Sequence, residues 1–356
     1  MEGNVQTGGG KRVHIELLRI LACYLVIFNH AGGISLFARC EPGSLAYWVY
    51  CIMGQICNAA VPLFFAISGA LLLPRTESIR DVYRKRVLRV AIVLLLVSAL
   101  YHVWRVRLGE AEPGLRYYFY TLYTSGHYVH LWYLYAFLPF LMALPLLRPM
   151  AQSLKNEHFL YMVLLWLLFA AVLPVAEYLI LQGESHNTNF NMNWLISPAV
   201  CYPFLGYYIE NRMDPVRAKK ALPLLWAVNT VCLLACGLLF RRILTVPDSD
   251  YSFFMDTFVL INMTVIYITV KSYFHDRTVK PAAAGVICSL GGCTFGIYLL
   301  HFIVLVAVRQ LGIAAFAEGL VGNEMLTVLL VSAVTMAISC AIVLVLKKIP
   351  YLNRLL

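Results

Sequence analysis

The stretch RILACYLVIFNH, residues Arg19–His30, is apolar enough to cross a membrane, yet it begins with a guanidinium and ends with an imidazole. In an α-helix, eleven positions correspond to three turns plus about 20°, over about 16.5 Å. Arg19 and His30 therefore lie on one helix face. Charged or titratable groups are costly against lipid, so this face should line a protein interior or a watered cavity. Glu16 precedes Arg19 by three positions and can pair with it.

The whole chain is as apolar as a membrane protein. Of 356 residues, 61% are hydrophobic and 13% are charged, whereas soluble domains carry about 25% charged residues. Most of the long uncharged runs reach the roughly 20 residues that a spanning helix requires. The sequence therefore predicts an all-α, polytopic membrane protein with about ten transmembrane helices. The runs are Ile20–Ala38, Pro42–Pro74, Val90–Trp104, Tyr117–Leu147, His158–Ala176, Ser185–Ile209, Ala221–Phe240, Thr257–Val270, Pro281–Val308 and Met325–Leu346.

The basic residues predict the orientation. With ten crossings, 21 of the 28 Lys and Arg residues fall on one side of the membrane, which predicts that both termini are cytoplasmic in a multi-pass protein of the inner (cytoplasmic) cell membrane. Basic residues that anchor the helices next to membrane lipid then account for the net charge of +10. No soluble basic domain remains that could bind nucleic acid. The ten cysteines show no CxxC pair and no zinc-type spacing, so we expect no metal; a Cys40–Cys51 pairing is the less favoured alternative.

The loops are short, so residues 11–356 are predicted to form a single transmembrane domain after a disordered tail, residues 1–10. The loop PRTESIRDVYRKRVLR, Pro74–Arg89, is the most cationic stretch. Leu115–Tyr128 is crowded with tyrosines, which favour the headgroup level. We expect it to be an interfacial or re-entrant piece that leads into the fourth span near His130.

Five motifs carry a resemblance to a known family. They are Arg19-x10-His30, VPLFFAISGALLL at the end of the second run, RKRVLR with Arg86 and Arg89, HLWYL at 130–134, and GIYLLH at 296–301. In this order, with about ten spans, the chain resembles the acyltransferase-3 family, integral membrane acyltransferases that modify surface glycans, antibiotics and other extracytoplasmic acceptors. The resemblance covers nearly the whole chain, and we expect a stand-alone form without a fused extracytoplasmic domain.

The resemblance implies a donor site and a catalytic residue. It makes His30 catalytic and gives Arg19, Arg86 and Arg89 to the donor, with acetyl-CoA favoured and other acyl-CoA donors left open. Arginines suit this role because their guanidinium groups contact phosphate oxygens in pairs. Glu16 stands where the family often has an acidic residue, and we expect it to position Arg19. His30 acts either as a general base or as a nucleophile that forms an acyl-imidazole.

The remaining candidates have two interpretations each. Ser68, in FFAISG, is assigned to the donor site as a contact for the thioester carbonyl, but a Ser-Gly pair more often permits close helix packing. His130, Trp132 and Tyr133 are predicted to form an acceptor platform for a sugar, or else are headgroup-belt residues. Tyr298 and His301 share a face of the ninth span and either line the cavity for substrate or anchor neighbouring helices.

The sequence therefore predicts a membrane O-acyltransferase, with O-acetyl transfer favoured, that moves an acyl group from cytoplasmic acyl-CoA to a hydroxyl of an extracytoplasmic or lipid-linked glycan. The alternative is a transporter or flippase of a small solute or acyl group that uses His30 as a proton relay. The sequence shows no internal repeat, which argues against transport. A third hypothesis is a non-catalytic subunit of a polysaccharide export complex. No pattern predicts an oligomeric state.

Overall fold

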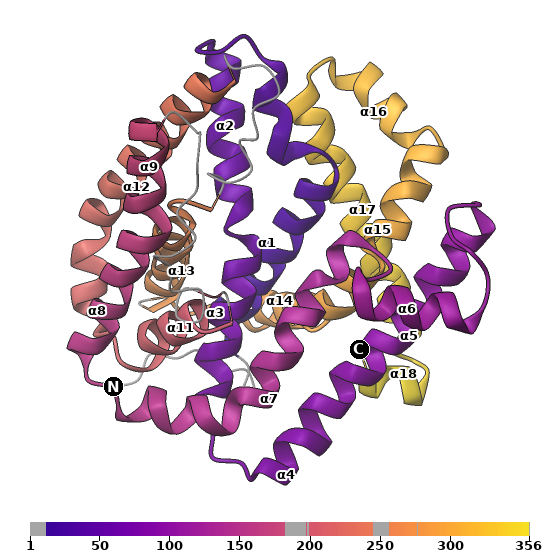
Figure 1. The fold of residues 1–356 in the computed structure, drawn as a ribbon, viewed down its shortest axis with the longest axis horizontal. Helices are drawn as coiled ribbons and strands as arrows, with labels where there is room; N and C mark the ends of the chain where they lie inside the picture. The colour runs from indigo at the N-terminus through magenta and orange to yellow at the C-terminus, as the bar shows by residue number, and fades with distance from the viewer. Residues whose placement is uncertain (1–11, 182–196, 198, 245–255, 276, 356) are drawn as a thin grey trace.

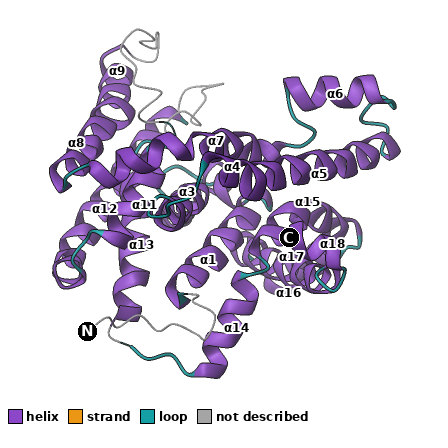
Figure 2. Ribbon diagram, turned by 90° about the horizontal axis from the view of Figure 1, so that it is seen from below, coloured by secondary structure: helices purple, strands orange, loops and turns teal. Residues whose placement is uncertain are grey.

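The computed structural model describes residues 12–181, 197, 199–244, 256–275 and 277–355. Every regular element in these ranges is helical, and none of the described residues forms a strand (Figures 1 and 2). The predicted all-α class is therefore confirmed. The predicted N-terminal tail, residues 1–10, lies outside the described residues.

The described part of the chain is a succession of helices. The α-helices are α1 (Val13–His30), α2 (Leu45–Asn58), α3 (Ala60–Leu72), α4 (Ile79–Val82), α5 (Leu88–Arg107), α6 (Leu115–Thr124), α7 (Trp132–Ser153), α8 (Asn156–Trp166), α9 (Leu173–Leu181), α11 (Cys201–Asn211), α12 (Pro215–Ile243), α13 (Val259–His275), α14 (Pro281–Gly291), α15 (Thr294–Gln310), α16 (Ile313–Val321), α17 (Glu324–Leu346) and α18 (Pro350–Leu355). Short 3₁₀ segments are η1 (Gly33–Arg39) and η3 (Val129–Leu131), and π segments are η2 (Tyr83–Val87) and η4 (Leu167–Val172).

Among the described residues, seven helical segments are long and apolar enough to cross a membrane. An eighth is the pair α14 and α15, which is bent by 57° at its break. The other two predicted spans overlap α11 and α13, which have 11 and 17 residues. The polytopic class is confirmed, while the number ten and the cytoplasmic termini stay predictions.

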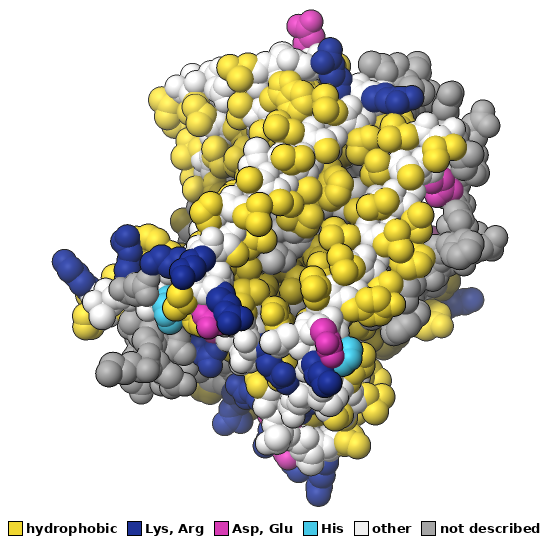
Figure 3. Space-filling model, turned by 90° about the vertical axis from the view of Figure 1, so that its left-hand side faces the viewer, with side chains coloured by type: hydrophobic (Ala, Val, Ile, Leu, Met, Phe, Trp, Pro, Cys, Tyr) yellow, Lys and Arg dark blue, Asp and Glu magenta, His cyan; other side chains and the backbone are white. Residues whose placement is uncertain are grey.

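The outer surface fits a lipid environment. Figure 3 shows a broad field of hydrophobic side chains, with Lys, Arg, Asp and Glu gathered mainly toward its upper and lower edges. Large apolar side chains such as Leu96, Leu164 and Val231 are more than half exposed. A soluble protein rarely exposes apolar patches of this extent, so the surface belongs to a protein that spans a bilayer.

Helix α1 occupies the centre of the bundle (Figure 1). It packs against α2, α3, α13, α14, α15 and α17. Residues on several sides of α1 are buried, among them Leu18, Ala22 and Phe28. The helix that carries Arg19 and His30 is therefore enclosed by protein, as its polar face requires.

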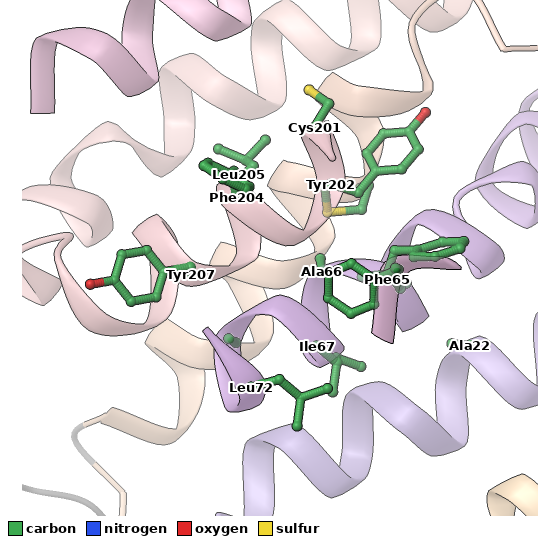
Figure 4. Packing of buried hydrophobic residues seen from close by; sticks show 14 of the residues in the cluster. Ala22, Phe65, Ala66, Ile67, Leu72, Cys201, Tyr202, Phe204, Leu205 and Tyr207 are labelled. Carbon is green, nitrogen blue, oxygen red and sulfur yellow. The ribbon is translucent and has the colours of Figure 1, made fainter. Parts of the chain in front are cut away.

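Helices α3 and α11 cross at very short range, and two glycines permit it. A Cβ at Gly206 would overlap the backbone carbonyl of Ala66, and a Cβ at Gly69 would overlap the backbone of Pro203. Figure 4 shows Ala66 and its neighbours on α3 facing the buried residues of α11. For Gly69, the close-packing interpretation of the Ser-Gly pair is therefore correct, since small residues let membrane helices approach.

We predict that Gly206→Ala destabilises the protein by about 1–3 kcal/mol, because the new methyl group must push two backbones apart. Gly285→Ala is the matched control, since Gly285 also lies in a helix but a Cβ added there would meet no atom within 4 Å. Thermal unfolding in detergent measures both variants. Equal melting temperatures for Gly206→Ala and the wild type would contradict the packing argument.

Candidate active site

A cavity of about 350 Å³ lies among α1, α3, η2, α5, α7 and the break between α14 and α15. This volume is at the lower end of the roughly 300–1,000 Å³ that is typical of small-molecule sites. Six of the residues predicted from sequence for donor or acceptor line it together: Arg19, Ser68, Arg86, Arg89, Tyr133 and Tyr298.

Four of the residues that line the cavity wall are cationic. Lys85, Arg86 and Arg89 come from η2 and the first turn of α5 and join Arg19 of α1 in the lining. The π segment adds a residue to the helical turn that carries Lys85 and Arg86, and such bulges are frequent at functional sites. This wall is suited to an anion with several negative charges.

The two arginines of the Arg86-x-x-Arg89 pair have different partners. Arg86 donates from Nε and Nη2 to the two carboxylate oxygens of Glu77, at 2.9 and 2.6 Å. Arg89 donates from Nε and Nη2 to the backbone carbonyl of Leu355 in α18, at 3.3 and 3.1 Å. The charge-assisted fork on Arg86 is the stronger attachment.

Glu77 also binds a second guanidinium. Arg148 of α7 donates from Nη2 to Oε2 of Glu77 at 2.7 Å and from Nε to the Leu72 carbonyl at 3.0 Å. The hydrogen bonds from Arg86, together with those from Arg148, lower the pKa of Glu77 to about 2. Glu77 is therefore ionised at every physiological pH.

Arg19 reaches the cavity from α1, and Glu16 fixes it there. The Nη1 atom of Arg19 donates to Oε1 of Glu16 at 2.9 Å, and Glu16 is 3% exposed. A Cβ at Gly291 would overlap the other carboxylate oxygen of Glu16. The break between α14 and α15 thus leaves room for the acid that holds Arg19.

Apolar side chains also line the cavity, among them Phe64, Phe137 and Leu141. Ser68 lies among them, and its hydroxyl donates to the Phe64 carbonyl one turn earlier at 2.8 Å. A slender, uncharged chain matches such walls better than a charged one.

Three histidines from three helical segments meet beyond the tyrosines of the cavity. The ring centroid of His30 lies 5.3 Å from that of His301 and 6.2 Å from that of His130. The cavity-lining residue Tyr298 donates its hydroxyl to the backbone carbonyl of His130 at 2.7 Å, and its ring centroid lies 6.2 Å from that of His301. Tyr298 therefore links the cavity to the histidine cluster.

The histidine cluster contains buried ring nitrogens, several of which have no hydrogen-bond partner. The Nδ1 atom of His301 lies 2.7 Å from the Tyr298 carbonyl, so Nδ1 carries the proton and Nε2 is left as an acceptor. That Nε2 atom, and both ring nitrogens of His130, are buried without a hydrogen-bond partner. Buried polar atoms without partners are costly, so a hydroxyl-bearing group fits here chemically.

Arg309 closes the end of α1 next to the cluster. Its Nη2 atom donates to the carbonyls of Ala31 and His30, at 3.1 and 3.4 Å. A cation at a helix C-terminus satisfies free carbonyls and opposes the helix dipole. Arg309 therefore fixes the residue that carries the imidazole.

The structure does not bring every predicted residue into the site. Trp132 starts α7 with 47% of its surface exposed and is absent from the cavity lining. Tyr133, the next residue, is buried and lines the cavity. The acceptor role of Trp132 stays a prediction, and its exposure agrees better with a headgroup-belt position.

Sequence reasoning missed Glu77, Arg148 and Lys85. Glu77 is an acid within the most cationic loop, which is a usable signal, but its partner Arg148 lies 71 positions away. The sequence assigns Arg148 only to the positive inner side. Its burial, at 4% exposed, distinguishes it from an anchoring residue.

No metal site appears among the described His, Cys, Asp and Glu residues, because no three of them are grouped to hold an ion. Cys40 and Cys51 both carry free thiols, so the alternative of a disulfide between them is wrong.

The fold is that of a multi-pass membrane protein, and its helices enclose a cavity that four cationic side chains line. Residues 12–344 match a family model described as an acyltransferase domain. The chain therefore belongs to the acyltransferase-3 family and is a membrane acyltransferase. No curated protein and no solved structure matches the chain.

We predict that the stabilising effect of Glu77 is lost in acid. The folded pKa of about 2 lies below the usual glutamate pKa of about 4.3, so the contribution is complete above about pH 4.3 and disappears as the pH falls toward 2. Melting temperatures of the wild type and Glu77→Gln should differ at pH 7, begin to approach each other below about pH 4 and meet near pH 2. A difference that stays constant from pH 7 to pH 3 would contradict this.

Proposed function

We propose that the protein is an acyl-CoA-dependent O-acyltransferase of the inner membrane, with His30 as the catalytic residue and a hydroxyl of an extracytoplasmic or lipid-linked glycan as the acceptor. The observation that carries the proposal is the cavity itself. Arginines line it together with apolar side chains, and its lining residue Tyr298 contacts the histidine cluster. O-acetylation with acetyl-CoA is the favoured case.

The cavity suits the parts of an acyl-CoA in order. Its volume of about 350 Å³ is too small for the whole molecule, so the phosphates and nucleotide would stay at the cationic wall. Arg86, Arg89 and Arg19 supply paired N–H donors for phosphate oxygens. The uncharged pantetheine arm would then pass Ser68 and the phenylalanines toward Tyr298.

His30 is suited to the chemical step because it is half-buried, beside the unpaired nitrogens of His130 and His301. As a general base, a neutral imidazole would take the acceptor's hydroxyl proton while the oxygen attacks the thioester carbonyl and the thiolate leaves. As a nucleophile, it would form an acyl-imidazole first. In both routes coenzyme A is released with a free thiol.

The acceptor would approach from the other side of the cluster. Tyr133 and Tyr298 offer rings, and His130 and His301 offer acceptor nitrogens for sugar hydroxyls. These four residues are the predicted substrate-binding set without the exposed Trp132.

Transport is the weaker alternative. Secondary transporters often pair two broken helices across a repeat. Only one bent pair, α14 and α15, occurs among the helices that the structure describes. Uptake of the acceptor without thiol release would favour transport over transfer.

We predict that His30→Ala binds coenzyme A normally and loses turnover by about 10²–10⁴-fold, the usual contribution of a general base. Thiol release from acetyl-CoA in the presence of an acceptor measures turnover, and calorimetry measures binding. His158→Ala, an exposed histidine of α8, is the control and should keep full activity. Normal turnover by His30→Ala would refute the assignment.

We predict that Arg89→Ala weakens coenzyme A binding and flattens the dependence of affinity on salt, because a phosphate contact is lost. Arg84→Ala removes an equal charge from the same segment, outside the cavity lining, and should change affinity little at about 0.15 M salt. Equal losses in the two variants would indicate a general charge effect instead of a contact.

A further inference from the structure

We propose that Glu77 is a positioning residue of the donor site, which fixes the guanidinium of Arg86 so that it meets a donor phosphate in one orientation. The inference rests on the proposed function, because it takes the cavity to be the donor site. Glu77 is absent from the cavity lining, so it acts through Arg86 and not by touching the donor.

The geometry leaves Arg86 partly free for a ligand. A guanidinium has five N–H groups in one rigid plane. Glu77 accepts from Nε and Nη2, which leaves the Nη1 edge without a protein acceptor in these contacts. The two-point contact sets the plane of the group, and the remaining donors belong to a side chain that lines the cavity.

Glu77 is itself held in place from the opposite side. Arg148, 4% exposed, bonds to Oε2 of Glu77 and to the Leu72 carbonyl at the end of α3. A continuous chain of contacts thus joins α3, α7, Glu77 and Arg86 of η2. Because the arginine is already ordered, the donor would not have to immobilise it, and preorganisation of this kind improves affinity.

Arg89 is held less firmly than Arg86. Arg89 is exposed and bonds to a neutral carbonyl, that of Leu355, at 3.1 and 3.3 Å. A phosphate can displace such a neutral acceptor more easily than a carboxylate. The orientation of Arg86 is therefore fixed before the donor binds, whereas the donor can replace the protein contact of Arg89.

Positioning and simple charge balance make opposite predictions. If Glu77 were only a counter-charge, its neutralisation would leave the wall more positive and tighten the binding of a phosphate ligand. If Glu77 orients Arg86, its neutralisation frees the guanidinium and weakens binding. The sign of the change therefore decides between the two.

The test uses the full chain in detergent or nanodiscs, with coenzyme A as the probe and calorimetry as the readout. Glu77→Gln is expected to weaken coenzyme A binding about three- to tenfold and to leave turnover at saturating donor unchanged. The matched control is Glu157→Gln, which removes the same charge from an exposed pair with Lys155 and should bind like the wild type. Unchanged or tighter binding by Glu77→Gln would overturn the inference.

A second comparison excludes a general structural effect. In an Arg86→Ala background Glu77 has no Arg86 guanidinium to orient, so adding Glu77→Gln should weaken binding no further. The same additional loss in both backgrounds would mean that Glu77 acts on the fold and not through Arg86, and would overturn the inference.

Glu77→Gln leaves Arg148 buried without its carboxylate, which can impair folding. The variant Glu77→Gln/Arg148→Met removes that cation too and should show the same weakening. The failure of the proposed function is separable: wild-type protein that binds no coenzyme A refutes the donor site, and the inference with it. If the wild type binds coenzyme A, and Glu77→Gln and the double variant bind it equally well, only the positioning role is refuted.

Discussion

Charged and titratable groups inside a membrane protein have to be enclosed by protein and paired, and α1 shows how this chain meets that demand. Arg19 and His30 lie eleven positions apart on a helix that six others surround. Glu16 neutralises the arginine, Gly291 leaves space for that acid, and Arg309 binds the carbonyls at the helix end. The guanidinium is therefore held by a contact within α1, and contacts with helices that are distant in sequence make room for that contact and bind the end of α1 that carries the imidazole.

The rest of the bundle supports this arrangement. Close contact between α3 and α11, through Gly69 and Gly206, packs the C-terminal end of α3 tightly. The carbonyl of Leu72, at the end of the same helix, accepts from Arg148, which in turn holds Glu77. Helix packing and the orientation of Arg86 at the cavity are thus parts of one contact network.

Much of this could be predicted from the sequence, because lipid imposes simple rules. Long uncharged runs indicated the helices, and the spacing of Arg19 and His30 placed both on one face of α1. Six predicted residues line one cavity, although they are spread from Arg19 to Tyr298. Proximity in sequence also helps to form this site, since Arg86 and Arg89 are only three positions apart and both line the cavity.

The missed features depend on contacts that no local pattern contains. Arg148 looks in sequence like any other inner-side arginine, and only burial distinguishes it. The meeting of His30 with His130 and His301 requires three helical segments to converge. Trp132 and Tyr133 are adjacent in sequence, yet of the two only Tyr133 lines the cavity. The rotation of α7 about its own axis decides which of them faces the cavity, and tertiary packing sets that rotation.

The central claim is that a donor anchored on the arginines extends its thioester to the imidazole of His30. A structure of the protein with coenzyme A bound tests this most directly. The account predicts phosphate density against Arg86, Arg89 and Arg19, with the sulfur beyond Ser68 and close to Tyr298 and His30. Coenzyme A density elsewhere on the protein, or a sulfur directed away from the histidine cluster, would contradict it.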